Sequence, residues 1–109
     1  MAIRELPRPV EIAGDPNATE MIRVWIANKS LCVSLLLGMY ADAEDSEIDE
    51  RDAWGELLSD VIKHIANGLH QSHGWDKAST ASQIRDALLR NLRRSDGLVE
   101  GSYWQDENK

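Results

Sequence analysis

The sequence predicts a two-layer α+β fold in which a β-hairpin, or a small antiparallel sheet built on it, packs on two α-helices. Three patterns carry this prediction. Apolar residues alternate over residues 22–36, and they recur at three- and four-residue steps over about 49–70 and again over about 76–94. The chain has 109 residues, of which 42% are hydrophobic, which suffices for one domain with a single core. We expect the aliphatic face of the hairpin to meet the apolar stripes of both helices there.

The N-terminal residues 1–14 are expected to form an extended arm, because Pro7 and Pro9 lie among scattered charges. Asp15 suits the N-cap and Pro16 the first position of a short helical turn before the first strand. An added N-terminal strand is left open. We assign the α+β domain to residues 15–97.

The hairpin has a predictable register. Asn28 and Lys29 form a two-residue turn, because Asn tolerates a positive φ. This turn places three aliphatic cross-strand pairs on one face: Ile22–Leu35, Val24–Val33 and Ile26–Leu31. A three-residue turn would instead pair apolar with polar residues.

The second face of the hairpin is also partly apolar. It carries Arg23, Trp25, Cys32 and Leu36. Isolated hairpins are marginally stable, and open strand edges invite pairing. Either the arm or the C-terminal tail, with Trp104, covers this face, or a second subunit does. We favour a second subunit, so these four residues are the candidate interface of a homodimer.

An acidic connector, residues 41–52, follows the hairpin and holds seven carboxylates. It lacks the glycine of a calcium loop, and its acids do not have the spacing of calcium ligands. The first helix is expected from about Asp49 to His70. Gly68 lies within its apolar stripe, where a glycine costs about 1 kcal/mol, so we expect another backbone to approach closely there.

Gly74 ends the first helical pattern, and Asp76 or Ser79 caps a second helix that runs to about Arg94. Gly97 is expected to cap its end in the left-handed conformation. Residues 98–109 show no periodicity and are assigned to a C-terminal tail.

No motif indicates catalysis. His64, His70 and His73 are not joined by Cys, Asp or Glu at a metal-ligand spacing, and no glycine-rich phosphate loop is present. We therefore predict no catalytic, cofactor-binding or metal-binding residues and a protein that is not an enzyme. An enzyme with His64 in a pocket beside Trp54 is the least favoured hypothesis.

The net charge of −7 opposes binding to nucleic acid or to anionic lipid. Arg90, Arg93 and Arg94 nevertheless share one side of the second helix, so a small nucleic-acid-binding regulator is the alternative to an interaction module. The sequence does not indicate a small-molecule ligand.

The N-terminus lacks the apolar core of a signal peptide, and the longest uncharged run, residues 30–41, is too short to span a bilayer. We therefore expect a cytoplasmic protein with no membrane partner.

Two segments, RVWIANKSLCVSL and AWGELLSDVIKHIANGL, carry a family resemblance. With them the chain resembles a family of small uncharacterised proteobacterial proteins, a domain of unknown function of about a hundred residues. The resemblance covers roughly Leu6 to Leu92 and implies a compact α+β domain. It implies no activity, so the function predicted here is a non-enzymatic homodimeric protein-interaction module.

Overall fold

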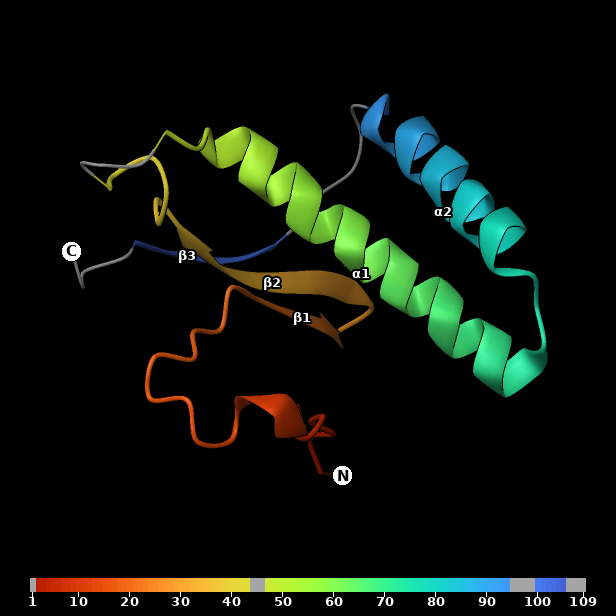
Figure 1. Cartoon of the computed structure of the whole chain (residues 1–109), viewed down its shortest axis with the longest axis horizontal. Coiled ribbons are helices and arrows are strands. Elements are labelled where there is room, and N and C mark those ends of the chain that lie inside the picture. Colours follow the sequence, from red (N-terminus) through yellow and green to blue (C-terminus); the bar gives the residue numbers. More distant parts are fainter. Residues whose placement is uncertain (1, 44–46, 95–99, 106–109) are drawn as a thin grey trace.

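The computed structural model describes residues 2–43, 47–94 and 100–105 and contains a three-stranded sheet and two long helices (Figure 1). A short 3-10 helix, η1, spans Val10–Ile12. The longer elements are β1 (Ile22–Ala27), β2 (Ser30–Leu37), α1 (Glu50–His73), α2 (Lys77–Leu92) and β3 (Glu100–Gln105). The predicted α+β class is confirmed.

The hairpin register is confirmed. β1 pairs antiparallel with β2, and Val24 lies opposite Val33 as the alternation predicts. Asn28 and Lys29 have φ values of 52° and 63°. Positive φ at both central residues is the geometry of a type I′ turn, whose twist matches that of the flanking strands.

The third strand comes from the C-terminal tail and not from the N-terminal arm. β3 pairs parallel with β2, so the sheet is mixed, with the order β1-β2-β3. Gly101 lies opposite Val33 with φ 149°, and a Cβ at this position would overlap the Val33 backbone. β3 can therefore approach β2 because residue 101 is a glycine.

Both helices begin at the predicted aspartates. The Asp49 side chain accepts a hydrogen bond from the Arg51 N–H at the start of α1, and Asp76 accepts one from the Ser79 N–H at the start of α2. Gly74 ends α1 in the left-handed conformation with φ 71°. α2 ends at Leu92, two residues before the predicted end, and Gly97 lies outside the described residues.

The helical turn of the arm lies earlier than predicted. η1 covers Val10–Ile12, whereas Asp15 accepts a hydrogen bond from the Asn17 N–H in a local turn. The proline at position 16 does not start a helix, because the aspartate side chain closes the turn after two residues.

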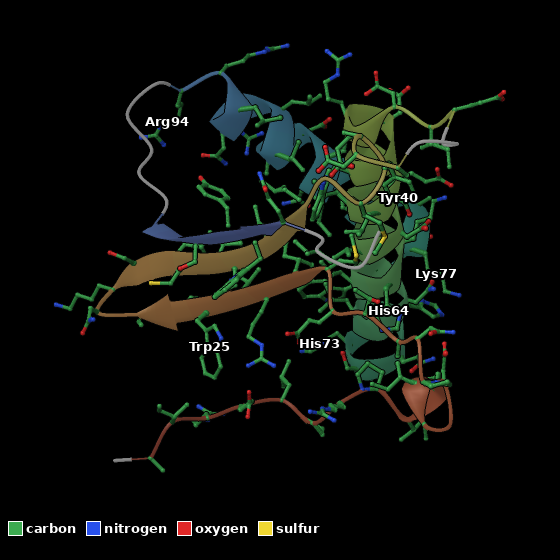
Figure 2. All side chains as sticks on the ribbon, turned by 90° about the vertical axis from the view of Figure 1, so that its left-hand side faces the viewer. Trp25, Tyr40, His64, His73, Lys77 and Arg94 are labelled. Carbon is green, nitrogen blue, oxygen red and sulfur yellow. The ribbon has the colours of Figure 1, made fainter. Side chains whose placement is uncertain are left out.

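The prediction of a single core between sheet and helices is wrong. Figure 2 shows the strands extending sideways from α1, with the hairpin turn at the end away from the helix. Exposure rises toward that turn, from a half-buried Ile22 to 53% at Val24 and 81% at Ile26. Ala66 of α1 is the only buried residue in the described ranges. Propensity and alternation set the strands, but they do not specify which layer covers them.

The helices form their own layer. α1 and α2 run side by side (Figure 1), and the half-buried residues of α2 recur at helical spacing: Thr80, Ala81, Ile84 and Ala87. The apolar stripe of α1 is wider than one helix can cover. Leu58, Val61 and Ile65 remain 41–43% exposed. Gly68 also lies in open space, so none of the described residues makes the predicted close approach there.

Candidate functional site

Glu50 joins the sheet to the helices. It occupies the first position of α1, directly after the Asp49 cap. Its Oε2 accepts hydrogen bonds from the Gly38 N–H at 3.0 Å and the Trp54 Nε1–H at 2.9 Å. Its Oε1 accepts from the backbone N–H groups of Tyr40 at 2.9 Å and Ala41 at 3.2 Å. One carboxylate therefore holds the chain leaving β2 against the start of α1.

These hydrogen bonds stabilise the ionised carboxylate. The pKa of Glu50 lies below its usual value, chiefly because of the backbone N–H groups of Gly38 and Tyr40. The neighbouring Asp49 has its pKa lowered to about 2, chiefly by the hydrogen bond from the Arg51 side chain. Both carboxylates lie in the first turn region, where the helix dipole also favours negative charge.

An open groove of about 610 Å³ lies beside this junction. Its wall consists of α1 together with residues from the chain before β1 and after β2. The lining residues are Met21, Tyr40, Ile48, Ala53, Trp54, Glu56, Leu57, Asp60, Val61, His64 and Ile65. Most of this lining is apolar, so the groove is suited to bury a hydrophobic surface.

His64 lies in this groove with Trp54, as the enzyme hypothesis would require. Among the described residues, however, no hydrogen bond orients its ring, and neither serine nor cysteine lines the groove. A general base normally acts on a nucleophile or substrate proton within hydrogen-bond reach and is held by a further partner. The groove supplies a surface for binding and no assembled nucleophile and base.

The other two histidines are engaged separately. His70 Nδ1 lies 2.8 Å from the Trp75 carbonyl oxygen, and His73 Nδ1 lies 2.6 Å from Ser72 Oγ. Within residues 2–43, 47–94 and 100–105, no group of three or more His, Cys, Asp or Glu side chains could hold a metal ion.

The candidate interface residues share one face of the sheet. Cys32 pairs with Trp25, and Leu36 pairs with Trp104 of β3. Trp25, Cys32 and Leu36 are half-buried, and the Trp25 side chain points toward the side where the N-terminal arm runs (Figure 2). Arg23 is held at this face by ion pairs to Glu5 of the arm at 2.9 Å and Glu20 at 3.1 Å.

The aliphatic face is also open, most of all toward the hairpin turn. Val24, Ile26 and Leu31 are 53%, 81% and 40% exposed, and Tyr103 adds a ring that is 74% exposed. The sequence did not indicate this because the aliphatic face was assigned to the core. Glu50 was also missed as a junction residue, because it lies in a run of acids without any distinctive spacing.

The arginines of the nucleic-acid hypothesis lie at the C-terminal end of α2 and just beyond it. Arg90 is in the last turn, and Arg93 is the C-cap. Arg94, which is labelled in Figure 2, follows directly. All three residues are exposed. Cations at a helix C-terminus interact favourably with its dipole, which accounts for their place without a nucleic acid.

No helix among the described residues is long and apolar enough to cross a membrane.

Comparisons with known proteins support the fold. A solved structure from the photosynthetic bacterium Rhodopseudomonas palustris, named "putative pyruvate dehydrogenase", is similar with a TM-score of 0.63 and 19% sequence identity. The match covers 89% of this chain and 92% of that chain. At this identity the likeness shows the fold alone.

No curated protein matches this chain in sequence. The family comparison covers most of the N-terminal arm, the hairpin and both helices. Residues 5–95 match the family described as "Domain of unknown function (DUF5076)", in agreement with the resemblance carried by the hairpin and α1, and the chain belongs to this family.

Proposed function

We propose that this protein is a non-enzymatic interaction module whose stable folded unit is a homodimer. The observation that carries the proposal is its surface. The single chain exposes 9839 Å², whereas a compact monomer of 12.2 kDa exposes about 6,100 Å². The excess is larger than the roughly 800 Å² per partner that a standard protein interface buries.

Much of the exposed surface is of the kind that interfaces bury. Large apolar side chains are exposed on β1 and β2, along α1 and at the end of α2, where Leu92 is 72% exposed. Large apolar side chains that are exposed in groups mark association sites. A second copy of the chain carries the same apolar surfaces, so the formation of a dimer would bury those of both copies at once.

The groove beside Glu50 fits an interaction role better than catalysis. It is lined by one polar stripe of Glu56, Asp60 and His64 and otherwise by apolar and aromatic side chains. A partner side chain inserted there would be surrounded by Trp54, Leu57 and Val61.

The test is the molar mass in solution. Light scattering coupled to size exclusion at micromolar concentration is expected to give about twice the 12.2 kDa chain mass. Sedimentation equilibrium over a range of concentrations then yields the dissociation constant. A mass of 12.2 kDa at every concentration, with cooperative unfolding, would contradict the proposal. A cytoplasmic location is part of this proposal.

Nucleic-acid binding through the surface of Arg90, Arg93 and Arg94 remains the alternative. This alternative requires that the affinity of the protein for nucleic acid falls steeply as salt is added. We expect a flat titration with duplex and single-stranded oligonucleotides at low salt. Binding that is lost in Arg90→Gln/Arg93→Gln and kept in the arm variant Arg8→Gln would favour the alternative.

A further inference from the structure

The register of the hairpin determines which backbone groups of β1 are available for hydrogen bonds at its free edge. Leu36 N–H donates to the Met21 carbonyl at 3.0 Å, which fixes the phase of the antiparallel ladder. Residues 21, 23, 25 and 27 therefore point their backbone groups toward β2. Ile22, Val24 and Ile26 point their N–H and C=O groups away from the sheet.

Nothing in the described residues satisfies these outward groups. The arm lies on the side toward which Trp25 points (Figure 2), where Glu5 pairs with Arg23, and its backbone hydrogen bonds are local, such as Ile12 N–H to the Pro9 carbonyl. Its apolar side chains do not pack there, since Ile3 is 83% and Leu6 90% exposed. Pro7 and Pro9 lack N–H groups and could not complete a ladder.

The edge also lacks the features that normally block pairing. Natural edge strands carry a proline, a bulge or an outward charge. β1 has none at its three outward positions, and its single charge, Arg23, is already ion-paired to Glu5 and Glu20.

We propose, on the basis of the proposed homodimer, that two copies join through antiparallel pairing of β1 with β1, which makes one continuous six-stranded sheet across a two-fold axis. The axis passes through Val24, which pairs with the partner's Val24. Ile22 then pairs with the partner's Ile26, so all three outward residues of each strand form ladder hydrogen bonds.

This register is self-complementary on both faces. On the aliphatic face, the branched side chains at positions 22, 24 and 26 extend the apolar surface across the axis. On the other face, Arg23 lies opposite the partner's Trp25, where a guanidinium can stack on an indole ring. Shifting the axis to residue 23 would oppose Arg23 to the partner's Arg23, and shifting it to residue 25 would leave Ile22 unpaired. Charge and hydrogen bonding thus select one register.

A disulfide crosslink tests the register directly. Hydrogen-bonded antiparallel pairs place Cα atoms about 5.5 Å apart, within the range that a disulfide spans. Cys32 is the only native thiol, so the test uses the full chain with Cys32→Ser. Val24→Cys is expected to crosslink to a dimer on mild oxidation. Trp25→Cys is the matched control, because its two copies would lie beyond the reach of about 7 Å.

Equilibrium variants test the same contact without oxidation. Val24→Pro removes an outward N–H and leaves the ladder to β2 intact, and Val24→Lys opposes two like charges across the axis. Each is expected to raise the dimer dissociation constant about tenfold or more. Leu31→Lys, on the same face but on the central strand, serves as the control and keeps the wild-type constant within about threefold.

The outcomes separate the two proposals. A wild-type dimer whose Val24→Cys variant does not crosslink, and whose mass is unchanged by Val24→Pro, overturns β1 pairing and leaves the homodimer intact. Crosslinking at Trp25→Cys in place of Val24→Cys overturns the register. A wild-type chain that is monomeric at all concentrations overturns both.

Discussion

Glu50 shows how one side chain can set the relation between two elements. Its two oxygens receive four hydrogen bonds, three of them from backbone N–H groups that follow the end of β2. Because β2 has no partner for these groups once the strand ends, the carboxylate replaces the ladder at that point. The orientation of α1 relative to the sheet therefore depends on this residue.

Glu50→Gln is expected to destabilise the fold by about 1 kcal/mol. The amide keeps one acceptor oxygen but presents an NH₂ group to N–H donors, which leaves donors unsatisfied. Thermal unfolding followed by circular dichroism measures the change. Glu56→Gln, on the same helix without these contacts, is the control and should unfold at the wild-type temperature; equal unfolding of both variants would contradict the role of Glu50.

The lowered pKa of Glu50 also predicts an acid sensitivity. A carboxylate whose folded pKa lies below its usual value of 4.5 contributes stability that is present above that value and is lost as pH falls through the folded pKa. We expect the stability difference between wild type and Glu50→Gln to be constant near neutral pH and to shrink below about pH 4.5. Denaturant titrations at a series of pH values measure it, and a difference that grows in acid would be inconsistent with this linkage.

Gly68 provides a second residue-scale test. A Cβ there would meet none of the described residues within 4 Å, so Gly68→Ala should stabilise α1 by about 1 kcal/mol through helix propensity alone. Gly55→Ala, also on α1 and also in open space, is the matched control. If a second subunit packs closely at Gly68, only the Gly55 variant gains this stability at concentrations where the dimer forms, and chemical denaturation of both separates the two cases.

At the scale of elements, β3 depends on its glycine more than on its side chains. Tyr103 and Trp104 are 74% and 62% exposed, so they bury little surface against the sheet. The strand is held by its parallel ladder to β2, in which Gly101 makes the close approach to Val33.

Gly101→Ala is therefore expected to detach residues 100–105 while the hairpin remains paired. The added methyl group overlaps backbone atoms, which cannot move aside as a flexible side chain would. Amide hydrogen exchange should show loss of protection in β3 with protection retained between β1 and β2. Ser102→Ala, in the same strand, is the control; protection of β3 that survives Gly101→Ala would contradict this account.

At the scale of the whole molecule, the two layers stand apart. The radius of gyration is 16.2 Å, whereas about 13 Å is typical of a compact chain of this length. The difference follows from a sheet that projects beyond α1 and an arm that does not pack. A single chain in which Ala66 is the only buried residue among those described has little hydrophobic stabilisation of its own.

The stability should therefore depend on association. If folding and dimer formation are linked, the unfolding midpoint rises with protein concentration. Calorimetry over a hundredfold range of concentration is expected to show a rise of several degrees. A midpoint that is independent of concentration would indicate a chain that is stable by itself.

The sequence determined the elements because their causes are local. Alternation over 22–35 and an Asn-Lys turn fix the hairpin and its register, and Asp49, Gly74 and Asp76 fix three helix ends. Each depends on residues within a few positions of one another. The family was likewise readable from the hairpin and α1.

Only the tertiary structure decided how these elements meet. The mixed sheet depends on a glycine in a tail without periodicity, the junction depends on one carboxylate among seven acids in the connector, and the aliphatic face is left open where a core was predicted. These are long-range pairings, and their residues have no spacing in the chain that distinguishes them from their neighbours. Periodicity tells which side of a strand or helix is apolar, but the surface that covers it is a property of the whole assembly.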